Sequence, residues 1–377
     1  MYISDIEGSP SLEVVNLVLQ KLSRGEKVTS LAIGEPSYKT PNKIIEIAYE
    51  SMKDGDTHYT SSYGIPEVRE AIVDKVKRKN GIKASVDNTI FITSKQSIFA
   101  TFMSLAGKRS KILLPNPGYF FSEPAEIAGL QPLYYKMKSD LSVDVEDILS
   151  KLDDNVAAVL VNSPNNPTGK VMEKEDLKVI YEAARERGVK IISDEAYEDL
   201  VYEKKHFSMG SLEDFPDTVI SIFSLSKSYS MTGWRAGYTV ADRKTISNIY
   251  KVIEHTYTCS PPFIQKASAY ALKYGDKFIE DFLSDFRKKR DMVSRRIGEI
   301  AGLSLSSIDG AFYAFPSYTK KVKSTVFSKE LLERHGTAVL PGIAFGSAGE
   351  AHIRISFSGT QESIDEGLDE IEKYLRE

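Results

Sequence analysis

Short apolar runs recur along the first two thirds of the chain, and polar residues follow each of them. Val219–Phe223 and Val156–Val161 are among the most apolar of these runs, and their length and β-branched residues predict buried strands. Three further runs predict strands in the same way: Thr89–Thr93, Lys111–Leu114 and Val189–Ser193. Helical patterns lie between several of these runs, such as Glu173–Arg187, which Gly188 ends.

This alternation of strands and helices predicts an α/β fold with a mainly parallel sheet and helices on both of its faces. In such sheets, ligands bind beyond the carboxyl ends of the strands. Polar segments stand at that position, including Asn162–Gly169 after one predicted strand and Asp194–Tyr197 after another. We therefore expect segments that are distant in sequence to meet in one binding site.

The last part of the chain indicates a second unit. A long, charged helical pattern over residues 276–300 is expected to bridge to it. Short apolar segments at Gly310–Pro316, Ala338–Gly342 and His352–Phe357 then predict the short strands of an α+β domain. The sequence thus predicts a large domain over residues 40–275 and a smaller domain that includes residues 276–377.

Composition narrows the classes of function. The formal net charge of -4 over 377 residues argues against binding to nucleic acid or to an anionic membrane. The basic runs Lys75–Lys79 and Arg287–Arg290 are expected to be solvated faces of helices. No apolar stretch is long enough to span a bilayer, no secretory signal is visible, and the single cysteine, Cys259, excludes an internal disulfide. We expect a cytoplasmic protein in a reducing compartment.

One segment carries the most specific chemical pattern. A predicted strand leads into Ser224-Leu-Ser-Lys227, and Gly233-Trp-Arg235-Ala-Gly237 follows. This segment resembles the cofactor-anchoring segment of the class I/II aminotransferases, which are fold type I enzymes that use pyridoxal 5'-phosphate. The resemblance implies that Lys227 is catalytic and forms an imine with the cofactor aldehyde, and that Ser224 and Arg235 bind the cofactor phosphate. An amine attacks an aldehyde only when it is neutral, so burial and a cationic neighbour would help by lowering the ordinary lysine pKa of about 10.4.

Other motifs match the same family residue by residue. Asp194, in Ser-Asp-Glu-Ala-Tyr, matches the aspartate that pairs with the pyridinium nitrogen of the cofactor. Asn166, in Asn-Asn-Pro-Thr-Gly, and Tyr197 match the groups that hydrogen-bond the phenolic oxygen of the cofactor. Tyr119, in Pro-Asn-Pro-Gly-Tyr, matches the aromatic side chain that stacks on the cofactor ring. Asn-Pro-Thr-Gly alone is also typical of an ordinary turn, and Asp194 also suits a helix N-cap. These assignments therefore depend on the order in which the motifs match those of the family.

The resemblance assigns further residues to phosphate binding and to a subunit interface. Thr93–Ser97 occupies the place of the phosphate-binding turn of the family, although Lys95 stands where a glycine is usual. The backbone N–H groups of Gln96 and Ser97, at the start of a helix, are expected to hold the phosphate. Tyr59 matches a tyrosine that reaches the phosphate of the neighbouring subunit, which implies a homodimer with shared active sites.

The resemblance also implies how the substrate is held. Arg354, in an Ile-Arg-Ile-Ser strand pattern, matches the arginine that binds the substrate α-carboxylate with two parallel N–H donors. Gly34 is expected to leave room for that carboxylate, and Asn166 is expected to contact the substrate as well as the cofactor. Ile33 and Tyr38 are candidates for lining the pocket and favour apolar or aromatic substrates.

The resemblance as a whole implies a pyridoxal-phosphate-dependent aminotransferase of fold type I that acts on an amino acid and a 2-oxo acid without a metal. In this family the N-terminal segment, here residues 1–39, joins the small domain. A pyridoxal-phosphate-dependent lyase of the same fold stays open, because it would share all of these residues and differ only in the bond that breaks. A regulator with a catalytically idle domain of this kind would need an added DNA-binding domain, for which this chain has no room.

Overall fold

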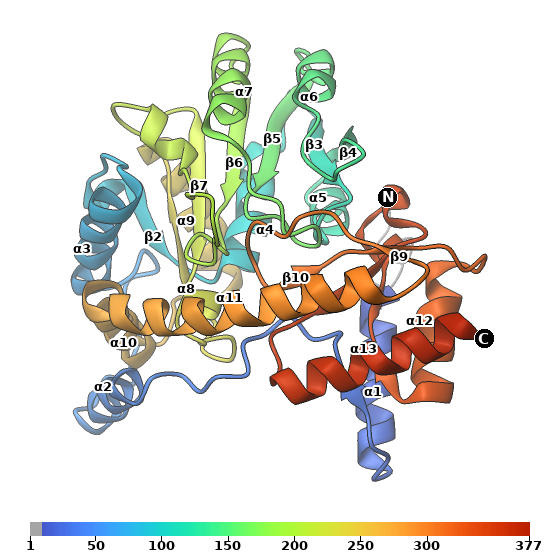
Figure 1. Cartoon of the computed structure of the whole chain (residues 1–377). Helices are drawn as coiled ribbons and strands as arrows, with labels where there is room; N and C mark the ends of the chain where they lie inside the picture. The colour runs from blue at the N-terminus through green and yellow to red at the C-terminus, as the bar shows by residue number, and fades with distance from the viewer. Residues whose placement is uncertain (1–9) are drawn as a thin grey trace.

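A seven-stranded sheet forms the centre of the larger unit in the computed structural model, which describes residues 10–377 of the chain (Figure 1). Its strands, in the order in which they lie side by side, are β2 (Thr89–Phe91), β8 (Gly237–Val240), β7 (Val219–Ser224), β6 (Lys190–Asp194), β5 (Val156–Asn162), β3 (Lys111–Asn116) and β4 (Gln131–Lys136). Neighbouring strands are parallel from β7 to β4, whereas β8 is antiparallel to both β7 and β2. The predicted α/β fold with a mainly parallel sheet is confirmed.

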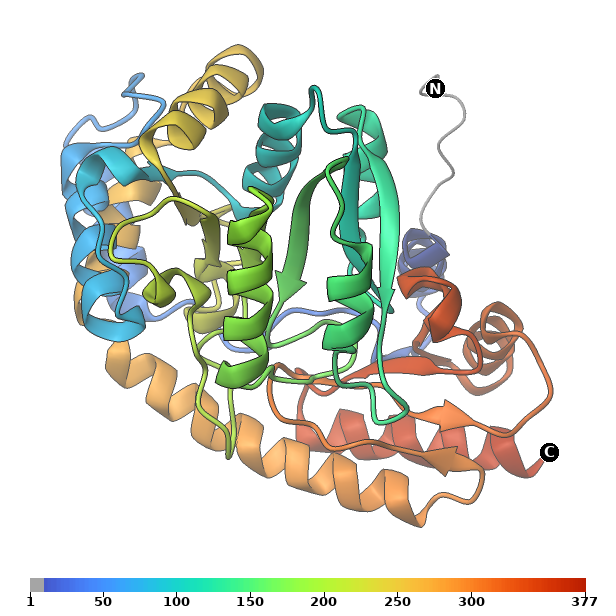
Figure 2. The same ribbon diagram turned by 90° about the horizontal axis from the view of Figure 1, so that it is seen from above.

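Helices cover both faces of this sheet (Figure 2). Successive residues of a strand point to opposite faces, and Ile191 and Ile192 of β6 accordingly belong to different clusters of buried side chains. Ile192 shares its cluster with α4 (Ser94–Leu105) and α9 (Arg243–Thr256), and Ile191 shares the other with α6 (Val145–Lys151) and α7 (Lys174–Glu186). Gly188 follows α7 with a φ of +59°, a conformation that glycine adopts without strain.

Further helices complete the larger unit at the edge beyond β2. They are α2 (Asn42–Lys53), α3 (Pro66–Lys75) and α10 (Pro262–Tyr274), and α10 packs against the other two. Two short helices, α5 (Ser122–Ile127) and α8 (Leu225–Ser228), follow strands directly or nearly so. Because α8 begins where β7 ends, Lys227 lies just beyond the carboxyl end of a central strand.

One long helix, α11 (Asp276–Glu299), passes along both units and carries the chain into the C-terminal one (Figures 1 and 2). That unit contains β9 (Leu303–Ser304), β10 (Tyr313–Ala314), β11 (Ser317–Tyr318), α12 (Ser324–His335), β12 (Thr337–Ala338), β13 (Leu340–Pro341), β14 (Ile353–Ser356) and α13 (Gln361–Arg376). Strand β14 pairs antiparallel with both β10 and β13. Strands β10, β13 and β14 lie within the three segments that the sequence predicts as strands, whereas β9 and β11 lie outside them.

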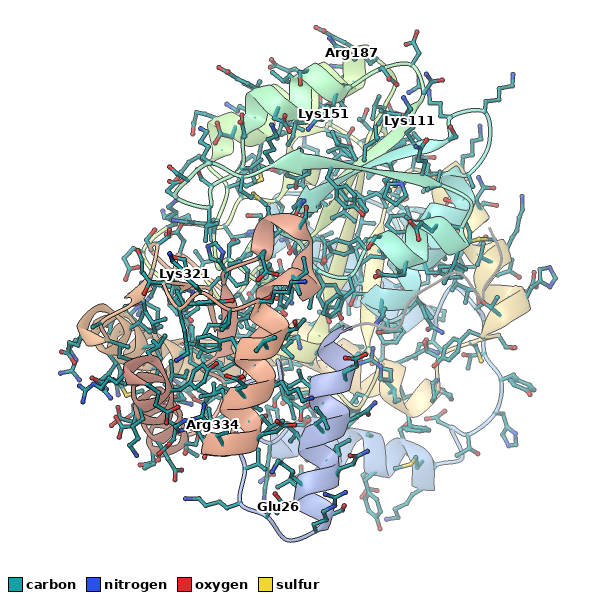
Figure 3. The ribbon with its side chains drawn as sticks, turned by 90° about the vertical axis from the view of Figure 1, so that its right-hand side faces the viewer. Glu26, Lys111, Lys151, Arg187, Lys321 and Arg334 are labelled. Atoms are coloured by element: carbon teal, nitrogen blue, oxygen red, sulfur yellow. The ribbon has the colours of Figure 1, made fainter. Side chains whose placement is uncertain are left out.

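The N-terminal segment joins the C-terminal unit. Helix α1 (Pro10–Ser23) lies beside α12, and Figure 3 shows Glu26 and Arg334 close to the neighbouring ends of the two helices. Strand β1 (Thr29–Ser30) pairs in parallel with β12. Residues 1–9 of the predicted N-terminal part of the small domain lie outside the described residues.

Two predicted solvated lysines are instead buried. Lys75 is 2% exposed, its ammonium group pairs with the Glu198 carboxylate, and it donates to Oδ1 of Asn80 at 2.9 Å. Lys289 is 4% exposed and pairs with Asp285 at 2.8 Å. The prediction is wrong for these two residues because each helix turns one position of its basic run inward. None of the helices between residues 10 and 377 is long and apolar enough to cross a membrane.

Candidate active site

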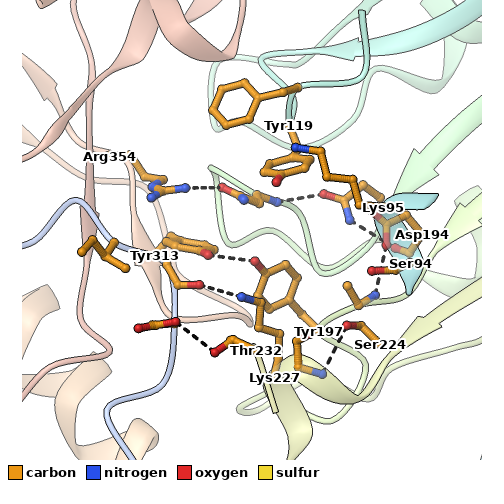
Figure 4. A pocket seen from close by; sticks show the side chains of 18 of the residues that line it. Ser94, Lys95, Tyr119, Asp194, Tyr197, Ser224, Lys227, Thr232, Tyr313 and Arg354 are labelled. Atoms are coloured by element: carbon orange, nitrogen blue, oxygen red, sulfur yellow. Dashed lines mark hydrogen bonds between the residues drawn. The ribbon is translucent and has the colours of Figure 1, made fainter. Parts of the chain in front are cut away.

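A cavity of about 390 Å³ lies where the carboxyl ends of β5, β6 and β7 meet the C-terminal unit (Figure 4). Most of the residues that the sequence assigns to a site line it: Gly34, Tyr119, Asn166, Asp194, Tyr197, Ser224, Lys227, Arg235 and Arg354. The structure thus brings together segments that lie far apart along the chain, at the edge of the sheet where α/β proteins bind ligands.

Lys227 projects from α8 into this cavity. Its Nζ donates a hydrogen bond of 2.6 Å to the carbonyl oxygen of Gly34. Burial, followed by the positive charge of Arg354, lowers the pKa of Lys227 from 10.5 to about 8. A lysine with this pKa has an appreciable neutral fraction near neutral pH and can act as a nucleophile or a base.

Asp194 lies at the end of β6 and is 6% exposed. Its Oδ1 accepts a hydrogen bond of 3.2 Å from the backbone N–H of Ala196. Burial raises the pKa of Asp194 from 3.8 to about 7, and the neighbouring Glu195 carboxylate adds to the rise. Across residues 10–377, no lysine, arginine or histidine forms an ion pair with Asp194. A buried carboxylate of this kind, open to a cavity, favours a cationic group in that cavity.

Arg354 reaches the same cavity from β14 of the C-terminal unit and is 4% exposed. Its Nη1 donates to Oδ1 of Asn166 at 3.2 Å, and its Nη2 donates to the carbonyl oxygen of Ala32 at 2.5 Å. Its buried Nε–H has no partner within the described chain, and no carboxylate there offsets its charge. A buried guanidinium without a counter-ion suits an anionic ligand.

Tyr197, in the segment after β6, places its hydroxyl 2.8 Å from the hydroxyl of Tyr313. A Cβ added to Gly34 would lie 2.2 Å from the Tyr313 hydroxyl, so a side chain at position 34 has no space. The phenol of Tyr313 takes the space that the missing side chain of Gly34 leaves, and Gly34 itself lines the cavity, so its expected contact with the substrate carboxylate stays a prediction.

Arg235 and several hydroxyl groups form a second place for an anion. Arg235 donates from Nη1 to the carbonyl oxygen of Thr232 at 2.6 Å and from Nη2 to Oγ1 of Thr93 at 3.0 Å. Its φ of +57° is uncommon for a residue other than glycine. Ser224 caps α8 by accepting a hydrogen bond of 3.3 Å from the N–H of Ser226, and both serines line the cavity. An arginine beside hydroxyl donors suits a phosphate group.

Tyr119 and Lys95 line the cavity on the side of the larger unit (Figure 4). The Nζ of Lys95 lies 5.9 Å from the centroid of the Tyr119 ring. In the part of the chain that the structure describes, no carboxylate pairs with Lys95. Its side chain thus contributes an unpaired positive charge to the cavity.

The predicted contribution of Ser97 is wrong. Its backbone N–H already donates to the carbonyl oxygen of Thr93 at 2.9 Å, and its fully buried hydroxyl accepts from Thr239 at 2.8 Å. No N–H of Ser97 is therefore available to a phosphate. Gln96, one residue earlier, does not line the cavity.

Two more residues expected near the site lie elsewhere. Tyr59 is 88% exposed and is not part of the cavity wall, as is necessary if it serves another subunit. Tyr38 stacks on Phe282 with ring centroids 4.6 Å apart and hydrogen-bonds Asp285, so its assignment to the pocket is wrong. Ile33 does line the cavity.

Sequence reasoning missed Tyr313, Ser226 and the side chain of Lys95. Tyr313 lies in the aromatic segment Gly310–Pro316, where the pattern predicts a strand and gives no sign of a site. Ser226 offers a clearer signal, because it lies within the same short motif as Ser224 and Lys227.

A separate charged cluster lies behind the cavity. Glu195, Glu198 and His206 bring three possible metal-ligand atoms within 4.8 Å of one another. Lys75 already pairs with Glu198, and Nε2 of His206 lies 2.7 Å from the Glu195 carboxylate. These charges satisfy one another, so we regard the cluster as a buried ionic network.

Comparison with known proteins gives similarities over nearly the whole chain. The family model for "Aminotransferase class I and II" matches residues 26–371. An aspartate aminotransferase from Pyrococcus horikoshii is 34% identical over 366 residues, which cover 95% of this chain and 93% of that protein. Aromatic-amino-acid aminotransferase 2 from Thermococcus litoralis is 35% identical over 383 residues, which cover 98% of each chain. The crystal structure of an aspartate aminotransferase from Thermotoga maritima matches with a TM-score of 0.93 and 30% identity, covering 100% of this chain and 99% of that one.

Proposed function

Because the chain belongs to the class I and II aminotransferases, we propose that the cavity between its two units is the active site and that Lys227 is the catalytic residue. The enzyme moves an amino group between an amino acid and a 2-oxo acid, and its cofactor is pyridoxal 5'-phosphate. One observation carries the proposed site. A lysine of lowered pKa, a buried carboxylate without a cation and a guanidinium without a counter-ion all open into one cavity.

The residues present fit the cofactor. Asp194 would hold the ring nitrogen as a pyridinium, which would supply the cation that its buried carboxylate lacks. Tyr119 would stack on the ring, and Arg235 and Ser224 would hold the phosphate. When bound, the cofactor supplies an aldehyde for Lys227 and a ring that withdraws electrons from the substrate α-carbon.

The amide of Asn166 is oriented by Arg354. Since Oδ1 of Asn166 accepts from Nη1 of Arg354, its NH₂ group remains free to donate to the phenolic oxygen of the cofactor, beside Tyr197. The two bonds from Arg354 to Asn166 and Ala32 fix the plane of its guanidinium, whose remaining N–H groups would bind the substrate α-carboxylate. Asn166 thus serves both cofactor and substrate.

Lys227 would move the proton of the reaction. In its neutral form Nζ would take the proton from the substrate α-carbon, and as an ammonium group it would return it. Arg354 would hold the α-carboxylate so that this C–H bond faces Nζ. The pKa of about 8 supports this role, because both forms of the amine are then accessible near neutral pH.

We propose an acidic amino acid as the preferred donor. The cavity wall contains the cations Lys95, Lys227, Arg235 and Arg354, against the anions Glu35 and Asp194. The cofactor and the α-carboxylate account for all of these except Lys95 and Glu35, and Glu35 accepts a hydrogen bond of 2.9 Å from Thr232. Lys95 is thereby left to bind a second carboxylate. The names of several relatives, as aspartate aminotransferases, support this choice.

Aromatic donors are the second candidate. Tyr119, Phe120 and Tyr313 line the cavity, and the relative from Thermococcus litoralis is named as an aromatic-amino-acid aminotransferase. The relatives give no support for the lyase that the sequence leaves open.

We also propose a cytoplasmic homodimer with shared active sites. The strong exposure of Tyr59, in a loop outside its own cavity, supports a role at the cofactor phosphate of a second subunit. The division into residues 40–275 and a small domain of residues 1–39 and 276–377 belongs to the same proposal. The pairing of β1 with β12 supports it.

A panel of amino donors with 2-oxoglutarate tests the proposed function, with release of the oxo acid and of glutamate as the readout. Aspartate and glutamate should react best, and Lys95→Met should lower kcat/KM for aspartate by roughly tenfold and leave that for phenylalanine nearly unchanged. Equal losses for both donors would remove Lys95 from substrate recognition.

A further inference from the structure

Tyr313 contacts two residues of the cavity wall, Tyr197 and Arg354. It is located on β10 and is 1% exposed, although its side chain forms part of the cavity wall. Its hydroxyl and its ring make different contacts. The hydroxyl contacts Tyr197, which is assigned to the cofactor, and the ring contacts Arg354, which is assigned to the substrate (Figure 4).

The ring of Tyr313 lies against the guanidinium of Arg354. The guanidinium carbon is 4.3 Å from the centroid of the Tyr313 ring and 5.2 Å from that of Phe345. A guanidinium over an aromatic face is attracted by the ring, and more strongly where water is excluded. The ring therefore offers a buried support for a cation that has no carboxylate partner in the described chain.

The hydroxyl of Tyr313 lies between Tyr197 and Gly34. It is 2.8 Å from the Tyr197 hydroxyl and fills the space that a side chain at Gly34 would need. Burial raises the pKa of both phenols, so each remains protonated and can donate. If Tyr197 donates to the phenolic oxygen of the cofactor, its own oxygen accepts from Tyr313, and such a chain of hydrogen bonds strengthens the outer donor.

We infer that Tyr313 is a positioning residue with two separable effects: its ring holds Arg354 for the substrate carboxylate, and its hydroxyl strengthens and orients Tyr197 for the cofactor. This inference rests on the proposed function of the cavity. The inference adds to the proposed function a residue that contacts both the cofactor side and the substrate side of the site. This residue also connects the C-terminal unit to the segment after β6.

The hydroxyl is tested by Tyr313→Phe, which keeps the ring. The readout is the pH at which the visible absorbance of the holoenzyme changes, because this pH reports how well the phenolic oxygen of the cofactor is held as an anion. Weaker donation from Tyr197 should move this midpoint upward by about half a pH unit or more, the size expected for weakening one hydrogen bond to a charged oxygen. The KM for the amino donor should stay within about twofold, because the support under Arg354 remains.

The ring is tested by Tyr313→Leu, with binding of maleate and of 3-phenylpropionate to the holoenzyme as the readout. Both probes carry a carboxylate but no amino or oxo group, so they bind without reacting. Loss of the ring should weaken the binding of both by roughly tenfold, as expected for a cation–π contact at a desolvated site. Tyr313→Met fills more of the lost volume and replaces the leucine variant if that variant does not fold.

The control is Tyr318→Phe, a second buried tyrosine of the same unit whose hydroxyl donates to the carbonyl oxygen of Val322 at 2.9 Å, away from the cavity. It should leave both readouts unchanged. The inference is overturned if Tyr313→Phe keeps the wild-type absorbance midpoint or if the folded leucine or methionine variant binds both probes as tightly as the wild type. Failure of the proposed function would look different, because the wild-type protein itself would then transfer no amino group.

Discussion

Arg354 of the C-terminal unit donates from Nη1 to Oδ1 of Asn166 in the larger unit at 3.2 Å. This bond joins the two units directly at the site and sets the direction of the Asn166 amide. The group that would bind the substrate carboxylate therefore also orients a group that would bind the cofactor.

Arg354→Lys should lower kcat/KM for the best amino donor by roughly 100-fold, with KM raised and kcat reduced. A lysine supplies one point charge, so it cannot hold Asn166, Ala32 and a carboxylate plane together. Steady-state kinetics measure this effect. Arg296→Lys is the matched control, since Arg296 pairs with Asp365 on the surface at 2.8 Å, and its kinetics should equal those of the wild type. Wild-type kinetics for Arg354→Lys would remove Arg354 from the site.

Lys227 should titrate far below an ordinary lysine in the cofactor-free protein. Its pKa is lowered to about 8, so its neutral fraction, and with it the rate of labelling by acetic anhydride, should rise through a midpoint near pH 8. Since Arg354 is the second cause of the lowered value, Arg354→Met should move this midpoint upward.

Peptide mapping of the labelled protein follows Lys227 separately from the other lysines. Borohydride reduction of the holoenzyme should likewise attach the cofactor to the peptide that contains Lys227. Attachment to another lysine would refute the assignment of Lys227, as would a labelling midpoint at the ordinary value of 10.5.

Gly34→Ala should impair the enzyme because its new Cβ would meet the Tyr313 hydroxyl at 2.2 Å. We expect a loss of roughly 1–3 kcal/mol in the free energy of unfolding, as for overpacking of a core. The double variant with Tyr313→Phe should recover part of that loss, because the other ring atoms lie 3.1 Å from the added Cβ. Urea unfolding measures both variants.

Gly298→Ala is the control for this pair, since a Cβ added to this residue of α11 would meet no atom within 4 Å. Alanine there should stabilise the protein by up to about 1 kcal/mol. A double variant that is no more stable than Gly34→Ala alone would show that the phenol is not the obstacle.

Lys75→Met should destabilise the protein by roughly 3–5 kcal/mol, because it leaves the buried Glu198 carboxylate without its cation. Adding Glu198→Leu should restore much of the loss, since two apolar side chains can replace a buried ion pair at little net cost. Lys43→Met, which breaks an exposed pair with Glu46, should change stability by less than about 0.5 kcal/mol. Similar small effects at both lysines would contradict the burial of Lys75.

Tyr59→Phe should weaken cofactor retention by roughly 1.5–3 kcal/mol, the range of one charge-assisted hydrogen bond. A subunit-mixing experiment tests whether Tyr59 serves the partner. Lys227→Ala mixed with Tyr59→Ala should regain activity, because one site of each hybrid dimer would have both residues intact. The control mixture of Lys227→Ala with Arg354→Ala should stay inactive, since both residues come from one chain. A first mixture that stays inactive despite proven subunit exchange would refute the shared site.

The sequence predicts the central strands well because their signal is local. Val156–Asn162 and Val219–Ser224 are buried along their whole length. The first is an uninterrupted apolar run up to Asn162, and the second is apolar apart from Ser221 and its polar end. The sequence does not predict two other strands of the same sheet. Gln131–Lys136 lies at the sheet edge with polar and exposed positions. Gly237–Val240 has only four residues and begins at the last residue of the motif Gly233–Gly237.

Site residues that lie within a motif, such as Lys227 and Asp194, can be predicted from the sequence. The reaction requires a particular residue type at each of these positions, directly after a strand. Tyr313 and Lys75 are not found, because their roles depend on partners more than 100 positions away. In the sequence, a tyrosine among aromatic residues resembles a core residue, and a lysine in a basic run resembles a surface residue. Only the fold places Tyr197 beside Tyr313 and Glu198 beside Lys75.

The parallel pairing of Thr29 with Thr337 and of Ser30 with Ala338 has a consequence for the order in which the protein is made. The ribosome releases β1 early, but the strand that completes it emerges near the end of synthesis. The central sheet, whose strands lie between Thr89 and Val240, can pair long before that. Until β12 arrives, α1 exposes its apolar residues Val14 and Val18, which are buried in the finished protein. The nascent chain therefore leaves these apolar side chains without their packing partners for most of its synthesis, and the C-terminal unit forms last.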